Sequence, residues 1–355
     1  MIYTPDNKLL RIGGRTLLSD GVLYFNYTCS YIDFEFVGTK AQAVLKTDLC
    51  PAEEMFRAWV GVFVNDELSS KFPLNEKETI IPLYEGEKKQ VRIRIMKLSE
   101  AAFAKCGLVS LDIDGELVPL TNKLPERRIE FVGDSITCGY GIDGVYEKDV
   151  FSTATENPLK GYAYLTAQKC RADFQYVSWS GMGVYSSYAE ESATEPNQWW
   201  LFKDIYPYTD SGVENTLGKE GHENHTKYDF SYKPQVTVFA EGTNDHSWTR
   251  FHPESCAEFE KAYGHILDLI RGGNPDTYIV CTYGVMEDLL KDNIAHQIEE
   301  FKKRHDDRII FVPFEKQDEE NDGVAVDWHP SAATHAKMSE KMAEVINGIF
   351  EKMGL

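Results

Sequence analysis

The chain has 355 residues, and 57 acidic against 37 basic side chains give it a net charge of −20. Residues 1–120 carry −3 of this charge and the rest of the chain carries −17. A negative field of this size repels phosphate backbones and anionic lipid, which excludes nucleic acids and membrane surfaces as partners, whereas a neutral substrate such as a sugar ester is compatible. Solubility alone would also explain the charge.

Length favours two domains, because a single hydrophobic core stops growing at roughly 250–300 residues. No run approaches the roughly 20 apolar residues of a membrane helix. The start, Met1–Asp6, lacks the basic region and apolar run of a signal peptide, so we expect a cytoplasmic protein. The 7 cysteines are odd in number and form no CxxC pair, which argues against a disulfide framework and a zinc cluster. The sequence leaves the oligomeric state open, and a homo-oligomer is compatible with it.

The first third of the chain is predicted to be a β-sandwich. Between residues 10 and 120, short β-rich runs alternate apolar and polar side chains with period two, which is typical of half-buried antiparallel strands. These runs are 21–27, 31–37, 58–64 and 90–96. None of them groups a nucleophile with a base, so this part is expected to pack against the remainder and to border the substrate.

A polar segment with a proline, Thr121–Arg127, separates this part from the rest, and we place the domain boundary between residues 122 and 123. Residues 123–355 are predicted to form a parallel, doubly wound α/β sheet, because compact apolar runs alternate with amphipathic stretches. The predicted strands are 128–132, 174–177, 235–240, 277–282 and 308–312, and the predicted helices include 256–271, 286–303 and 331–353.

A long segment, 190–233, rich in aromatic, acidic and glycine residues, interrupts this alternation. Loops of such length are usually functional or disordered. Its aromatic residues favour an ordered wall of the active site.

Three blocks of residue types that can carry catalysis directly follow predicted strands, and a fourth lies near the C-terminus. Gly133–Gly141 follows the first predicted strand, Ser178–Gly183 the second and Glu241–Asp245 the third, and Asp327–Ser331 lies near the C-terminus. In parallel α/β sheets the reactive groups gather at the carboxyl ends of the strands. Each motif alone is common, but their order and their placement together point to one catalytic site.

These four blocks resemble those of the SGNH (GDSL-like) hydrolases over residues 128–355. The resemblance looks closest to carbohydrate esterase family two, in which a jelly-roll β-sandwich precedes a three-layer α/β/α hydrolase domain. The resemblance implies removal of acetyl groups from xylan or other sugars without a metal or other cofactor. An acetylated oligosaccharide or polysaccharide is the implied partner.

Carried over to this sequence, the resemblance implies that Ser135 is the nucleophile and His329 the base that takes its proton. The backbone N–H groups of Ser135 and Gly181 and the side-chain amide of Asn244 would form the oxyanion hole. Gly183 is a rival for the role of Gly181. Three side chains are expected to support the site by hydrogen bonds: Asp134, Thr243 and Asp245.

The group that orients the imidazole of His329, the third member of a catalytic triad, is left open. Many members of the superfamily place an aspartate three residues before the histidine, but position 326 is Val and the acid is Asp327, two residues before. Either the Asp327 side chain orients His329, or a backbone carbonyl does, and we favour the carbonyl. Pro330 restricts His329 to extended backbone conformations.

Three aromatic residues, Trp328, Trp248 and Tyr208, are candidates for stacking on sugar rings, with core packing as the alternative. His222 and His225 have the spacing of metal ligands, but no third ligand is evident, so we expect solvated loop residues.

Two other functions remain open at this stage. A lipase or thioesterase would use the same fold and nucleophile, because neither selects the acyl chain. A carbohydrate-binding protein with a catalytically inactive hydrolase domain is the second alternative.

Overall fold

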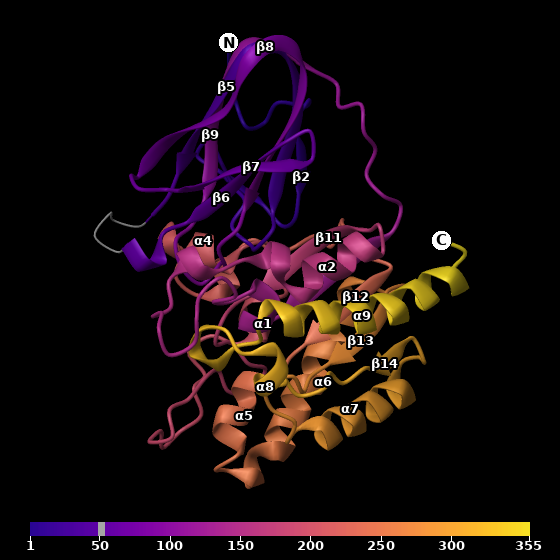
Figure 1. Cartoon of the computed structure of the whole chain (residues 1–355). Helices are drawn as coiled ribbons and strands as arrows, with labels where there is room; N and C mark the ends of the chain where they lie inside the picture. The colour runs from indigo at the N-terminus through magenta and orange to yellow at the C-terminus, as the bar shows by residue number, and fades with distance from the viewer. Residues whose placement is uncertain (49–53) are drawn as a thin grey trace.

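The computed structural model describes residues 1–48 and 54–355, so Cys50 lies outside the described residues. The antiparallel strands cluster at one end of the molecule, and the parallel sheet with its helices forms the other end (Figure 1). The six described cysteines are free thiols. Within the described ranges, no helix has both the length and the apolar character that crossing a bilayer requires.

The N-terminal part is an antiparallel sheet of nine strands, in the order β3-β4-β9-β5-β8-β6-β7, with β1 paired to β9 and β2 to β5. The strands are β1 (Ile2–Tyr3), β2 (Arg11–Gly13), β3 (Leu17–Ser19), β4 (Val22–Tyr24), β5 (Tyr31–Lys46), β6 (Trp59–Val64), β7 (Glu67–Pro73), β8 (Glu78–Lys97) and β9 (Gly107–Val118).

The strands β5 and β8 are much longer than the runs predicted for them, and register shifts interrupt their pairing near Gly38 and Ala41. Such irregularities bend a strand. Alternate residues along both halves of β5, such as Phe34 and Ala43, are buried in one apolar core, together with Ile93 of β8. The predicted N-terminal β-sandwich is confirmed, and its strands are hydrogen-bonded in one continuous antiparallel sheet.

The second part contains a five-stranded parallel sheet in the order β11-β10-β12-β13-β14. The strands are β10 (Arg128–Gly133), β11 (Asp173–Ser178), β12 (Val236–Ala240), β13 (Tyr278–Thr282) and β14 (Ile309–Phe311), within two residues of the predicted bounds.

Helices cover both faces of this sheet, so the predicted three-layer α/β/α architecture is confirmed. The residue Phe131 of β10 packs in the core that includes α2 and α9, whereas its neighbour Val132 packs in the core that includes α6 and α7. The α-helices are α1 (Ser135–Cys138), α2 (Tyr162–Lys169), α3 (Phe202–Ile205), α4 (Ser211–Thr216), α5 (Thr243–Thr249), α6 (Cys256–Gly273), α7 (Lys291–Arg304), α8 (Glu319–Asp322) and α9 (Ala332–Lys352). Short 3-10 helices span Glu54–Phe56, Thr153–Thr155, Pro158–Lys160, His222–Asn224, Pro253–Ser255 and Val326–Trp328.

The helix predicted from residue 286 begins only at Lys291. Before it, Met286 and Glu287 line the pocket described below and Leu290 is buried, so tertiary contacts set the start of the helix.

The two sheets are joined through buried contacts. Arg15, fully buried, forms an ion pair of 3.2 Å with Glu130 of β10, and Tyr31 of β5 donates a hydrogen bond of 3.0 Å to Asp173 of β11. The connection runs from the end of β9 to the start of β10, and the boundary between residues 122 and 123 stays a prediction.

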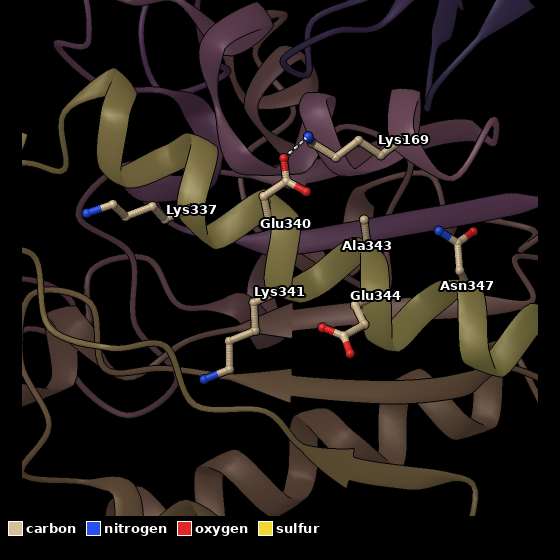
Figure 2. Close-up of a pocket in the computed structure, with 7 residues that line it drawn as sticks. All are labelled: Lys169, Lys337, Glu340, Lys341, Ala343, Glu344 and Asn347. Carbon is tan, nitrogen blue, oxygen red and sulfur yellow. Dashed lines mark hydrogen bonds and ion pairs between the residues drawn. The ribbon is translucent and has the colours of Figure 1, made fainter.

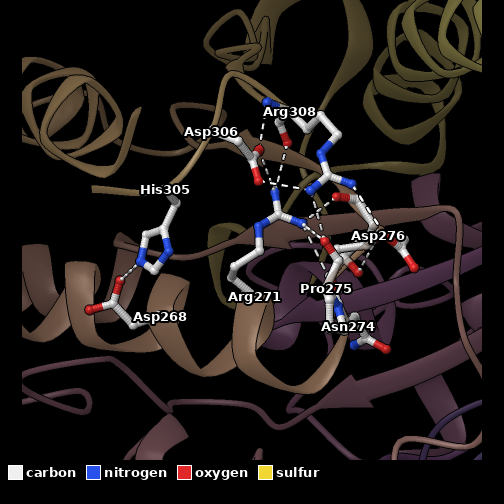
Figure 3. Close-up of polar contacts among 10 residues, drawn as sticks. Asp268, Arg271, Asn274, Pro275, Asp276, His305, Asp306 and Arg308 are labelled. Carbon is white, nitrogen blue, oxygen red and sulfur yellow. Dashed lines mark hydrogen bonds and ion pairs between the residues drawn. The ribbon is translucent and has the colours of Figure 1, made fainter. Parts of the chain in front are cut away.

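A polar cluster ties α6 to the loops that precede β13 and β14 (Figure 3). Nη1 of Arg271 donates to the carbonyl oxygen of Thr277 at 2.7 Å, and its Nη2 lies 3.1 Å from an oxygen of Asp306. Asp306 in turn binds Arg308 at 2.9 Å. These groups lie at the amino ends of the strands, opposite the edge where the catalytic motifs were predicted, so the cluster stabilises the fold.

Candidate active site

Ser135 lies where the central strand β10 gives way to the short helix α1. The preceding residue, Asp134, is the N-cap, and its Oδ1 accepts a hydrogen bond of 2.9 Å from the N–H of Ile136. The side chain of Ser135 is nearly buried but lines an open pocket. The strand end and the cap together fix where the hydroxyl group points.

The side chain of His329 reaches this hydroxyl. Its Nε2 lies 2.8 Å from Oγ of Ser135, and its Nδ1 lies 3.2 Å from the backbone oxygen of Asp327. A carbonyl oxygen only accepts, so Nδ1 carries the proton and Nε2 presents its lone pair to the serine. This is the arrangement that a general base requires.

The carboxyl group of Asp327 has a different partner. Its Oδ2 accepts a hydrogen bond of 2.8 Å from the hydroxyl of Tyr140. The contact between Asp327 and His329 thus runs through the backbone carbonyl, which was the alternative favoured from the sequence.

The turn that carries His329 is strained. Asp327 (φ +50°) and Trp328 (φ +61°) are two consecutive non-glycine residues in the left-handed region, which costs energy for each of them. His329 itself is extended, with φ −70° and ψ 161°, as Pro330 requires. The two left-handed residues fold the Asp327 carbonyl back toward the imidazole.

The imidazole of His329 stacks on the ring of Tyr140, with 4.2 Å between ring centroids. Although part of the side chain faces the pocket, burial of the ring lowers the pKa of His329 to about 4. The histidine is therefore neutral near pH 7 and able to accept a proton.

The turn after β11 brings Gly181 into the pocket lining. Gly181 has φ +76°, which favours glycine, and an added Cβ would meet nothing within 4 Å. Among the described residues, no hydrogen bond takes up its N–H or that of Ser135. The rival, Gly183, lies outside the lining, and its N–H donates to Oγ of Ser187 at 3.3 Å. The geometry therefore favours Gly181.

Asn244, at the start of α5, also lines the pocket. Its Nδ2 lies 2.8 Å from the carbonyl oxygen of Met182 and 3.2 Å from Oδ2 of Asp134. These contacts hold the amide between the β10 and β11 turns. The strand order places β11, β10 and β12 side by side, which brings Gly181, Ser135 and Asn244 together.

Two buried carboxyl groups support these turns, as the sequence suggested. Asp245 accepts hydrogen bonds from three successive N–H groups, of Val184, Tyr185 and Ser186, at 2.8–3.1 Å. Burial raises the pKa of Asp134 to about 7 and that of Asp245 to about 6. The third expected support, Thr243, lies in the pocket lining.

The pocket has a volume of about 670 Å³. Polar groups such as Ser180, Arg250 and Glu287 form much of its wall. The full lining comprises Ser135, Tyr140, Ser180, Gly181, Tyr188, Thr243, Asn244, His246, Ser247, Arg250, Met286, Glu287, Asp327, Trp328 and His329.

Of the three predicted stacking residues, only Trp328 lines the pocket. Trp248 is a correction: it is buried, stacks on His252 at 3.8 Å and donates to Ser255 through Nε1 at 3.1 Å. Tyr208 is a second correction: it forms an isolated β-bridge with Lys227 and does not line the pocket. The choice between stacking and packing depends on tertiary neighbours.

The segment 190–233 is ordered, as predicted, and contains α3 and α4 with the buried rings of Trp200 and Tyr206. It contributes no residue to the pocket lining, so its prediction as a wall of the site is wrong. Instead it packs against the N-terminal part, where Arg15 donates to the carbonyl oxygen of Tyr206 at 2.6 Å.

His222 and His225 lie in this segment with ring centroids 5.4 Å apart, and Nε2 of His225 lies 2.8 Å from the carbonyl oxygen of Lys219. The expectation that both are solvated is wrong for His225, which is buried. Over the described ranges, no group of three or more His, Cys, Asp or Glu side chains is placed to hold a metal.

A second hollow lies on the outer surface of α9 (Figure 2). An ion pair across it joins Lys169 of α2 to Glu340 of α9. The lining consists of charged side chains with Ala343 and Asn347, and no nucleophile is paired with a base there.

Sequence reasoning missed two residues that touch the site machinery. Tyr140 lies inside the Gly133–Gly141 block, so its position in the motif was a signal that was available. Glu100, which binds Ser180 from the N-terminal part, lies in no motif, and nothing in the sequence marks it.

Comparisons with known proteins agree with this geometry. Residues 131–337, more than half of the chain, match the GDSL-like lipase/acylhydrolase family. The chain belongs to this family. Residues 12–120 match the N-terminal domain of carbohydrate esterase family 2, so the resemblance inferred from the motifs is confirmed in both parts of the chain.

Two named relatives and one solved structure are similar to this chain over most of its length. The chain is 32% identical over 328 residues to cellulase/esterase CelE of Acetivibrio thermocellus, which covers 90% of this chain but 37% of CelE. It is 24% identical to an acetylxylan esterase / glucomannan deacetylase of Cellvibrio japonicus, over 96% of this chain and 89% of that protein. A family two carbohydrate esterase from Clostridium thermocellum, solved in complex with cellohexaose, has a TM-score of 0.81 and 29% identity, with 97% of this chain and 99% of that chain covered.

Proposed function

We propose that this protein is a serine esterase that removes O-acetyl groups from carbohydrate. The observation that carries the proposal is the hydrogen bond of 2.8 Å between Oγ of Ser135 and Nε2 of a histidine whose Nδ1 faces a carbonyl oxygen. A serine paired with a neutral, oriented imidazole is the arrangement of an activated nucleophile.

In the first step, Oγ of Ser135 attacks the acetyl carbonyl carbon while Nε2 of His329 takes the hydroxyl proton. The tetrahedral oxyanion is held by the N–H groups of Ser135 and Gly181 and by the amide of Asn244, whose Nδ2 exchanges its longer bond, 3.2 Å to Asp134, for the oxyanion. The intermediate collapses to acetyl-Ser135, and the imidazolium returns its proton to the departing sugar oxygen. Water then attacks the acetyl-enzyme while His329 takes its proton; the bond to Oγ breaks, acetate leaves, and His329 returns the proton to Ser135.

The pocket supports a sugar ester as substrate. Its wall combines polar side chains with apolar and aromatic surface, as a sugar ester requires, and the charge of −20 does not oppose a neutral ligand. Trp328 offers a ring on which a sugar face can stack. The relatives named as acetylxylan esterases point to the same substrate class, an acetylated oligosaccharide or polysaccharide.

The test is acetate release from acetylated xylan and from 4-nitrophenyl acetate, with wild type, Ser135→Ala and wild type plus a metal chelator. We expect an active wild type, an inactive variant and no effect of the chelator. A wild type that binds xylan without cleaving any ester would favour a carbohydrate-binding protein. Cleavage of long-chain esters in preference to acetyl esters would favour a lipase.

A further inference from the structure

We propose that Glu100, in the segment that links β8 to β9 of the N-terminal sheet, positions the Ser180–Gly181 turn of the active site. This inference rests on the proposed function, because it assigns the N–H of Gly181 a part in binding the oxyanion. It makes the N-terminal part a component of the catalytic site.

Both carboxyl oxygens of Glu100 accept hydrogen bonds from the turn. Its Oε2 accepts a hydrogen bond of 2.7 Å from the N–H of Ser180, and its Oε1 accepts another from the hydroxyl of the same residue. Glu100 is completely buried. A buried acceptor that holds both the backbone and the side chain of one residue fixes its orientation and position.

Glu100 is itself held in place. Its N–H donates to Oε2 of Glu156 at 3.0 Å, and its carbonyl oxygen accepts from Nζ of Lys97. Burial, followed by the neighbouring Glu100, raises the pKa of Glu156 well above its usual range. The backbone of Glu100 is thus anchored at both its N–H and its carbonyl oxygen.

Trp179 and Met182 pack in an apolar core on either side of the turn, but no side-chain packing holds Gly181 itself. Gly181 has no side chain, and the space where a Cβ would lie is empty to 4 Å. Besides the bonds of Ser180, the N–H of Tyr188 donates to the carbonyl oxygen of Gly181 at 2.7 Å, the N–H of Met182 donates to the carbonyl oxygen of Trp179 at 3.4 Å, and Nδ2 of Asn244 donates to the carbonyl oxygen of Met182 at 2.8 Å. Without Glu100 the turn would lose both hydrogen bonds of Ser180, the residue whose peptide group carries the Gly181 N–H.

The same β8–β9 segment also reaches the histidine side of the pocket. Phe103 packs against Phe151, which stacks on Tyr140 with ring centroids 3.8 Å apart, and Tyr140 stacks on His329. The segment therefore contacts neighbours of both the oxyanion turn and the base.

The experiment compares Glu100→Ala, Glu100→Gln and Ser180→Ala, with kcat and KM measured separately on 4-nitrophenyl acetate. Removing an oxyanion donor outright lowers the rate by about 10²–10³-fold. A displaced donor should cost less, so we expect Glu100→Ala to lower kcat at least about tenfold with little change in KM. Glu100→Gln keeps an acceptor for the Ser180 N–H and should recover most of this loss. Ser180→Ala removes one of the two bonds and should lower kcat by a smaller factor.

The matched control is Tyr31→Phe, which removes the hydrogen bond to Asp173 between the same two parts but away from the pocket. It should lower the melting temperature without lowering kcat. A folded Glu100→Ala protein with the kcat of wild type would overturn the inference. If Glu100→Ala does not fold, Ser180→Ala decides, and an unchanged kcat there overturns it. An inactive wild type would instead refute the proposed function.

Discussion

The serine side and the histidine side of the pocket are built in different ways. On the serine side, buried carboxyl groups hold the turns: Asp134 caps the helix of Ser135, and Asp245 gathers three N–H groups of the neighbouring turn. On the histidine side, a strained turn places a backbone carbonyl against Nδ1, and the ring of Tyr140 supports the imidazole.

This difference follows from what each side has to do. The oxyanion donors must be fixed before charge develops, and hydrogen bonds to buried acceptors fix a backbone well. The base must gain and lose a proton at each step; burial lowers the pKa of His329 and keeps it neutral between steps, while the carbonyl of Asp327 holds the ring. We therefore expect the two sides to respond differently to substitution.

The largest effect is expected for the base itself. His329→Ala removes the group that accepts the serine proton, and kcat on 4-nitrophenyl acetate should fall by at least about 10³-fold. The matched control is His305→Ala. His305 is an exposed residue at the end of α7, outside the pocket lining, so this variant should keep the rate of wild type. A His329→Ala enzyme within tenfold of wild type would contradict the account.

The next largest effect is expected on the serine side. Asn244→Ala removes the amide that bridges the β10 and β11 turns and faces the pocket, so kcat should fall by about 10²–10³-fold. KM should change little, because the interaction develops in the transition state. A rise in KM at constant kcat would mean that Asn244 binds substrate in its ground state instead.

The pH profile tests the histidine side in a different way. Burial lowers the pKa of His329 to about 4, and a protonated imidazole cannot act as base. Activity should therefore be lost as the pH falls, with the acid limb of kcat/KM well below the ordinary histidine pKa of about 6.5. An acid limb near 6.5 would show that the imidazole is more fully solvated.

The smallest effect is expected for Asp327→Asn. In a Ser-His-Asp triad the equivalent change costs about 10⁴-fold. Here the side chain binds Tyr140 and only the carbonyl meets His329, and asparagine can still accept from the tyrosine hydroxyl. We expect a loss of only a few-fold in kcat, and a triad-sized loss would show that the carboxyl group orients the base.

Much of this architecture could be predicted from the sequence, because parallel strands buried on both faces appear as continuous apolar runs. The residues Ser135, Gly181 and Asn244 each follow such a run, and the topology alone brings them together. Residues placed by tertiary packing could not be predicted. The stacking predicted for Trp248 was wrong for this reason, and Glu100 reaches the pocket from another sheet.

The measurement that tests the central claim most directly is capture of the acetyl-enzyme. Wild type is mixed with 4-nitrophenyl acetate and quenched in acid within the first turnover, and its peptides are analysed by mass spectrometry. The account predicts one added acetyl group, on the peptide that contains Ser135, and none in Ser135→Ala. An active wild type that carries its acetyl group on another residue, or that shows no acetyl-enzyme under conditions where acetate release is rate-limiting, would contradict it.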